Sequence, residues 1–210
     1  AHRRGARLLL DGAQTAGHIT VDVRDLDCDF YSIPGQKWLL GPDQTGALYI
    51  REDLIPLIEP TGIGFRSVER VLYPDGYELR PDIDKLRVSS TSTALRAGLV
   101  AAISFIQDIG TSRIDERNLS LASSLKSGLA SIAGVTVLSP MDGPGCSGLV
   151  SFTIDGIEPE HAVGRLWDSH RVLIREVPYP SCIRVSLDFF NTEEEVARLV
   201  EAVRGMAESS

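Results

Sequence analysis

An apolar run that stops abruptly at an acidic residue sets the expected fold class of this chain. The stretch Ala6–Gln14 reads ARLLLDGAQ, so three leucines are followed directly by Asp11 and Gly12. This pattern is typical of a buried parallel strand whose carboxyl end carries the acid. Two further strands are expected at residues 28–33 (CDFYSI) and 45–50 (TGALYI). Open α/β sheets place ligands at the carboxyl ends of their strands, so Asp11 marks an edge where a site is expected.

The second half of the chain alternates between strand and helix patterns, which also favours an α/β fold. A capping box formed by Thr192 and Glu195 opens the last helix. We place a domain boundary near Gly110, which gives domains at 1–109 and 110–210. The segment 51–90 contains four prolines and is expected to be irregular and to serve function or an interface. The expected helices are 93–109, 113–132 and 159–170, and the expected strands are 135–138, 148–154, 171–175 and 182–187.

Composition argues against several classes of partner. The formal net charge is -8, and the only basic run is HRR at residues 2–4, so nucleic acid is not an expected partner. The longest apolar stretch, 98–106, is too short to span a bilayer, so no membrane association is expected. The three cysteines are odd in number and widely spaced, which indicates a reducing, cytoplasmic location. The four histidines form no cluster, so no metal site is expected.

A single lysine in an unusual setting suggests a cofactor. Lys37 lies in YSIPGQKWLLGP, between two expected bends, at the end of the strand that follows Asp11 and Gln14. Pyridoxal phosphate (PLP) forms a Schiff base with a lysine amine, and a carboxylate keeps its pyridine nitrogen protonated. From these residues alone a structural interpretation stays open, because Asp-Gly is a common turn and Gly-x-Lys is a weak motif.

Longer motifs resemble the class V group of fold-type I PLP-dependent enzymes. They are residues 8–50, EPTGIGFRS at 59–67, SSTSTALRAGL at 89–99 and CIRVSLDFFNTEEEVARLV at 182–200, and they occur in the order found in that group. The resemblance is nearest to the cysteine/cystine C–S lyase and isopenicillin-N-epimerase-like branch. It implies the C-terminal part of the PLP-binding large domain, within 1–109, followed by a small C-terminal α/β domain. It also implies that the N-terminal half of the fold is missing.

The resemblance assigns roles around the cofactor. Lys37 would form the Schiff base, Asp11 would pair with the pyridinium nitrogen, and Gln14 would hydrogen-bond the ring hydroxyl. Gln36 falls where many members have a phosphate-contacting histidine, and Pro34 where many have a serine.

Anchoring of the phosphate departs from the family pattern. Pro34 has neither an N–H nor a hydroxyl to donate, so Ser32 or another loop would have to supply the contact. Thr91 matches the threonine that reaches the neighbouring subunit's phosphate across a homodimer interface. The alternative for Thr91 is a helix N-cap within SSTST.

Two arginines are expected to bind the substrate. Arg184 lies between apolar neighbours in an expected strand, where a charge is costly unless it is paired. Its planar guanidinium suits a carboxylate, and in the resembling family the arginine of this RxS stretch binds the substrate carboxylate. The alternative is a structural ion pair with Asp188 or a nearby glutamate. Arg175 is the second candidate.

The resemblance implies a C–S lyase that acts by β-elimination on cysteine, cystine or an S-substituted cysteine. Cysteine desulfurases carry a nucleophilic cysteine on a loop before the carboxylate-binding arginine. Here the segment 176–183 is short, and Cys182 lies in a strand, where packing is its expected role. Aminotransferase, epimerase and desulfurase-like activities remain alternatives, as does a non-catalytic structural subunit with a PLP fold. His18 is interpreted as a loop histidine with no catalytic role.

Overall fold

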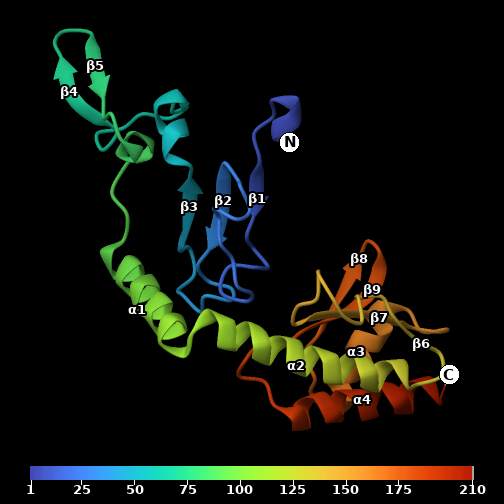
Figure 1. The fold of residues 1–210 in the computed structure, drawn as a ribbon. Coiled ribbons are helices and arrows are strands. Elements are labelled where there is room, and N and C mark those ends of the chain that lie inside the picture. Colours follow the sequence, from blue (N-terminus) through green and yellow to red (C-terminus); the bar gives the residue numbers. More distant parts are fainter. Residues whose placement is uncertain (210) are drawn as a thin grey trace. The chain divides into compact units, whose positions relative to one another are not determined.

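A computed structural model describes residues 1–209 and divides the chain into two compact units (Figure 1). The N-terminal unit consists of Ala1–Gly17 and Val21–Asp108, and the C-terminal unit consists of His18–Thr20 and Ile109–Ser210. The short segment 18–20 therefore belongs to the C-terminal unit although the residues on either side of it do not.

The N-terminal unit is built on a three-stranded sheet of order β1-β2-β3. Strand β1 (Leu9–Asp11) pairs in parallel with β2 (Phe30–Pro34), and β3 (Gly46–Ile50) pairs antiparallel to β2. The predicted parallel strand is confirmed, but the prediction that it is buried is wrong, because the Leu9 side chain is 59% exposed. Successive side chains of a strand point to opposite faces of the sheet, and the face that carries Leu9 is largely uncovered in this chain.

The segment 51–90 is more regular than predicted. It contains a 3-10 helix at Glu52–Leu57, a β-hairpin of β4 (Val68–Leu72) and β5 (Gly76–Leu79), and a second 3-10 helix at Ile83–Leu86. The sequence Pro74-Asp75-Gly76 at the tip of the hairpin is a known turn signal, and it could have identified the hairpin. Helix α1 (Thr93–Ile109) follows with the predicted bounds.

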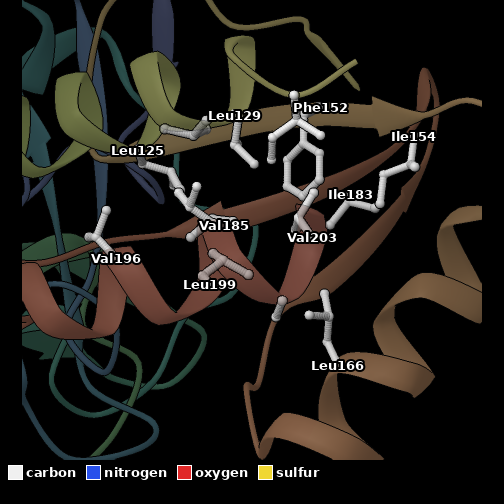
Figure 2. Close-up of a cluster of buried hydrophobic side chains, with 14 of the residues drawn as sticks. Leu125, Leu129, Phe152, Ile154, Leu166, Ile183, Val185, Val196, Leu199 and Val203 are labelled. Carbon is white, nitrogen blue, oxygen red and sulfur yellow. The ribbon is translucent and has the colours of Figure 1, made fainter. Parts of the chain in front are cut away.

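The C-terminal unit pairs a four-stranded antiparallel sheet, of order β6-β7-β9-β8, with three helices. Its helices and sheet enclose one hydrophobic core, to which α2, α3, α4, β7 and β9 all contribute side chains (Figure 2). The sheet consists of β6 (Val135–Val137), β7 (Leu149–Ile154), β8 (Arg175–Pro178) and β9 (Ser181–Ser186), and the helices are α2 (Thr111–Ala130), α3 (Pro159–His170) and α4 (Glu193–Ala207).

Local signals predicted most elements of this unit, but the helix expected at 113–132 spans Thr111–Ala130, and one strand begins later than expected. The capping box of α4 is confirmed, since Thr192 Oγ1 accepts a hydrogen bond from Glu195 N at 3.2 Å and Glu195 Oε2 accepts one from Thr192 N at 3.0 Å. The predicted strand 171–175 is wrong, because β8 begins only at Arg175. Arg171 adopts a left-handed conformation with φ of 53° and caps α3, so the next residues leave the helix before strand pairing can begin.

No helix among residues 1–209 combines the length and the apolar character needed to cross a membrane. Within the same residues, His, Cys, Asp and Glu side chains form no group of three or more that could hold a metal ion.

Candidate functional site

Asp11 is the last residue of β1, and the backbone that follows it passes close to β2. Gly12 follows Asp11, and a Cβ atom at this position would lie 2.4 Å from the Ser32 carbonyl oxygen, so only glycine fits. Asp11 Oδ1 accepts hydrogen bonds from Ala13 N at 2.9 Å and from Ser32 Oγ at 3.1 Å. Asp11 Oδ2 has no protein partner within residues 1–209 and is available for a ligand.

Lys37 lies on the turn that directly follows β2, at the same carboxyl edge of the parallel strand pair as Asp11. Two glycines and a helix residue fix this turn: Cβ atoms at Gly35 and Gly41 would lie 2.8 and 2.9 Å from Leu99 Cδ1 of α1. The Lys37 side chain is exposed, and its amine makes no hydrogen bond or ion pair within residues 1–209. The turn therefore has a packed base and presents an unengaged amine.

The loops that carry Gln14 and Lys37 contact each other. Trp38 Nε1 donates a hydrogen bond to Gln14 Oε1 at 3.0 Å. Gly17, at φ of 90°, packs so closely that a Cβ atom there would lie 2.7 Å from the Trp38 carbonyl oxygen. With Oε1 engaged by the indole, the Gln14 amide nitrogen is the atom left to donate to a ligand. The structure thus brings Asp11, Gln14 and Lys37 to one edge of the N-terminal unit.

The two residues expected near a phosphate group, Gln36 and Pro34, differ in their ability to donate hydrogen bonds. Gln36 is exposed on the Lys37 turn and can donate from its amide, whereas Pro34 is the last residue of β2. The Ser32 hydroxyl, considered from the sequence as a phosphate contact, instead donates to Asp11. The Ser32 hydroxyl hydrogen is therefore not available to donate to a phosphate in this arrangement.

Thr91 is exposed and lies just before α1. The residue that caps this helix is Ser92, whose hydroxyl accepts a hydrogen bond from Leu95 N at 3.3 Å. The alternative interpretation of Thr91 as the helix cap is therefore wrong, and its hydroxyl has no partner within residues 1–209.

The two predicted substrate arginines lie together in the C-terminal unit. Arg175 of β8 and Arg184 of β9 are directly opposite each other in the antiparallel register, and both line a pocket of about 410 Å³. Neither forms an ion pair with a carboxylate of residues 1–209, so the alternative Arg184–Asp188 pair is wrong. The Arg184 Nε atom is buried and has no hydrogen-bond partner within the same residues.

The charges around this pocket favour an anionic ligand. Arg171 and Arg198 also line it, and the only acidic side chain in the lining, among the residues that the structure describes, is Glu195. Glu195 Oε2 is already engaged, since it accepts hydrogen bonds from Asn191 Nδ2 at 2.9 Å and from Thr192 N at 3.0 Å. Two opposed guanidinium groups repel each other, and a carboxylate between them would remove that repulsion.

Sequence reasoning missed the environment of His18. This side chain is fully buried, and its Nε2 accepts a hydrogen bond from Gly148 N at 3.0 Å, while Asn118 Nδ2 donates to the His18 carbonyl oxygen at 3.1 Å. Burial lowers the pKa of His18 to about 4, so the ring is neutral near pH 7. Asn118 also contacts the buried Asp188 at 3.3 Å, and burial raises the pKa of Asp188. A lone histidine in a loop carries no local signal of such burial.

Cys182 is 2% exposed within β9, which agrees with the packing role expected from the sequence. Its register partner on β8 is Val177. A side chain in this position cannot swing toward a substrate without local opening of the sheet.

Comparison with known proteins gives a consistent result. The family model described as aminotransferase class-V matches residues 1–199. A protein named cysteine desulfurase from Enterobacter sp. (strain 638) is 32% identical over 97% of this chain and 52% of its own length. Among solved structures, the apo cysteine desulfurase from Thermococcus onnurineus NA1 has a TM-score of 0.91 at 29% identity, over 100% of this chain and 55% of that one.

A second enzyme among the solved structures is the cystine C–S lyase C-DES. Its complex with its reaction product, cysteine persulfide, has a TM-score of 0.84 at 30% identity, over 94% of this chain and 52% of that chain. A lysine-to-alanine variant of C-DES, described with glycine covalently linked to the PLP cofactor, has a TM-score of 0.83 at 30% identity, over 96% and 54%. The chain thus spans about half the length of the relatives that it matches.

Proposed function

The chain belongs to the aminotransferase class-V family, and from this we propose that it forms part of a PLP-dependent carbon–sulfur lyase acting on cysteine, cystine or an S-substituted cysteine. One observation carries the proposal: the unengaged amine of Lys37 follows β2 at the carboxyl edge where β1 presents Asp11. The predicted α/β, fold-type I class of the chain is confirmed by its similarity to the desulfurase structures. We further propose that 1–109 is part of the PLP-binding large domain and that 110–210 is the small domain.

The residues at this edge suit PLP in their chemistry. Asp11 Oδ2 would accept a hydrogen bond from the protonated pyridine nitrogen, and the other oxygen of Asp11 accepts hydrogen bonds from Ala13 N and Ser32 Oγ. Gln14, oriented by Trp38, would donate its amide N–H to the ring hydroxyl. Gln36 would donate to the phosphate, and Thr91 would reach a phosphate of the second subunit in a homodimer. When bound, PLP supplies an electrophilic carbon for the amine of a substrate and a ring that accepts electrons.

We propose roles for two groups of the chain's own residues in substrate binding and proton transfer. Arg184, with a buried and unpartnered Nε, would bind the α-carboxylate of the amino acid, and Arg175 on the opposite strand would assist. The Lys37 amine would take the Cα proton as general base. Loss of that proton lets the Cβ–S bond break, so that the sulfur leaves with the bond electrons. After hydrolysis the rest of the amino acid ends as pyruvate and ammonia.

The relatives named cysteine desulfurase make that reaction the main alternative. A desulfurase transfers sulfur to a cysteine of its own, and Cys182, the cysteine nearest Arg184 in sequence, is buried within a strand. This favours the lyase. Transamination and epimerisation would use the same Lys37, Asp11 and Arg184, and a non-catalytic subunit would use none of them.

The cofactor attachment is tested by borohydride treatment of the full-length protein with PLP, followed by peptide mass spectrometry. We expect a pyridoxyl group on Lys37, and a Lys37→Ala variant should lose it together with the visible absorption band. The chain has two other lysines, Lys85 and Lys126, which serve as internal controls because both are buried. A label on either of them instead would disprove the assignment.

The Asp11→Asn variant tests whether Asp11 is needed for turnover rather than for binding of PLP. We expect this variant to retain PLP and to lose most turnover, by roughly 100-fold or more, because a neutral amide does not stabilise the protonated ring. Full activity in this variant would contradict the proposed role of Asp11.

The reaction type is tested by product analysis with cysteine and cystine. We expect pyruvate without any added keto acid, and we expect Cys182→Ser to keep most of that activity. Alanine as the product, with sulfur release lost in Cys182→Ser, would identify a desulfurase. A requirement for a keto acid would identify an aminotransferase.

A further inference from the structure

A buried lysine and a half-buried cysteine lie together in the C-terminal unit, outside the residues used above. Lys126 of α2 is 3% exposed, and its Nζ donates hydrogen bonds to the carbonyl oxygens of Pro140 and Met141 at 2.7 and 2.9 Å. The same Nζ lies 3.4 Å from the Sγ atom of Cys146. Cys146 comes from the segment 138–148 between β6 and β7, so a helix and a loop meet at this pair.

The surroundings of Lys126 give its charge no carboxylate partner. The Nζ contacts are two neutral carbonyl oxygens and one sulfur, and no ion pair links Lys126 to an acidic side chain of residues 1–209. A buried ammonium group without a counterion is costly. The Lys126 amine is therefore held against the Cys146 sulfur with no acidic side chain of residues 1–209 competing for it.

Access distinguishes Cys146 from the other cysteines. Cys28 and Cys182 are buried, whereas Cys146 is only half-buried. Its loop is open, since Gly143 and Gly145 are exposed and a Cβ atom added to either glycine would meet no other part of the described chain within 4 Å. Small oxidants can therefore reach the Cys146 sulfur without unfolding of the unit.

We propose that Cys146 and Lys126 form an oxidant-sensitive pair, which a peroxide converts into a covalent sulfur–nitrogen link between α2 and the 138–148 loop. In the first step, hydrogen peroxide transfers an oxygen to the Cys146 sulfur: an S–O bond forms, the O–O bond breaks and water leaves. The sulfur is oxidised to a sulfenic acid and the peroxide is reduced.

In the second step, Lys126 releases its ammonium proton to solvent and the neutral amine attacks the same sulfur. The S–N bond forms, the S–O bond breaks, and the hydroxyl leaves as water with the second amine proton. A dithiol reverses the link, because it returns hydrogen to sulfur and nitrogen and itself becomes a disulfide.

The test is peptide mass spectrometry of the full-length protein after treatment with hydrogen peroxide, without cofactor or substrate. We expect trypsin to leave residues 118–165 as one peptide, because a modified Lys126 is not cleaved, with a mass two hydrogens below that of the same unlinked segment; after dithiothreitol, trypsin should again cut at Lys126. Iodoacetamide should label Cys146 of the untreated folded protein about ten-fold or more faster than Cys28 or Cys182.

Matched variants separate the pair from general oxidation. Lys126→Arg keeps the positive charge without a nucleophilic amine and should give no link, whereas Lys85→Arg changes another buried lysine and should keep it. Cys146→Ser should abolish the link and Cys182→Ser should not. Oxidation of Cys146 to sulfinic acid with no linked peptide in the unmodified chain would overturn the proposal, as would equal labelling of all three cysteines.

Discussion

The two units differ in where their apolar side chains find cover. In the C-terminal unit, Phe152, Ile183 and Leu166 are fully buried in one core shared by sheet and helices (Figure 2). In the N-terminal unit, by contrast, Leu9 on β1, Leu48 on β3 and Phe105 on α1 are all exposed. Both units contain strands and helices. A regular sequence pattern therefore gives an element its conformation, while the stability of that element depends on a surface to pack against.

Hydrogen exchange should show this contrast most strongly. Amides of β7 and β9 sit in the closed core and are expected to exchange about a thousand-fold or more slowly than amides of β1 and α1, because local opening costs least where few apolar contacts must break. Exchange of this chain, followed by mass spectrometry, measures the ratio. Equal protection in both units would show that they do not differ in local stability.

Two matched Phe→Ala substitutions should differ in their effect on the free energy of unfolding. Phe152→Ala removes a fully buried ring from the C-terminal core and is expected to lower the free energy of unfolding by about 3–5 kcal/mol. Phe105→Ala removes a ring that is 52% exposed on α1 and is expected to cost less than about 1 kcal/mol. Urea unfolding monitored by circular dichroism tests both. A larger effect from Phe105→Ala would show that α1 is buried in solution.

The C-terminal unit should lose stability as the solution becomes acidic. The folded state holds His18 neutral with a pKa of about 4, below the ordinary 6.5, so the unfolded chain binds more protons between these values. Stability is therefore fully present above pH 6.5 and falls by about 2–3 kcal/mol as the pH drops toward 4. The charge of Asp115 acts to raise the pKa of His18 and so makes this loss of stability smaller. Burial raises the pKa of Asp188 above 3.8, so protonation of Asp188 partly offsets the loss as the pH falls toward 3.8.

Urea unfolding between pH 7 and 4 measures this slope. His18→Gln should flatten it, while His161→Gln, which removes an exposed histidine of the same unit, should leave it unchanged. The N-terminal unit should respond with the opposite sign. Hydrogen bonds to Asp29 and Asp27 raise the pKa of His2, so its contribution is present below pH 6.5 and is lost as the pH rises through the folded pKa.

Helix capping should give the smallest difference. Thr192→Ala removes the side-chain cap of α4 and is expected to cost about 1 kcal/mol. Thr91→Ala is expected to be nearly neutral for the stability of this chain, because Ser92 caps α1. Thermal unfolding compares the two variants. A large loss in Thr91→Ala would mean that the Thr91 hydroxyl has a structural partner in solution.

Sequence patterns alone determined the elements and much of the candidate site. The bounds of α1 and α3, the capping box of α4 and the parallel pairing of β1 followed from local signals, because caps, turns and periodicity act over a few residues. The same was true of Asp11 and Lys37 at strand ends. Their roles with a cofactor stay predictions.

Tertiary structure alone decided which side chains are covered and which polar groups meet. The burial of His18 depends on Asn118 and Gly148, which lie 100 and 130 residues further along the chain. The link from Trp38 to Gln14 and the opposition of Arg175 and Arg184 likewise depend on how loops and strands pack. Pairwise contacts at such separations leave no periodic trace in the sequence, because each depends on the fold of everything between the two partners.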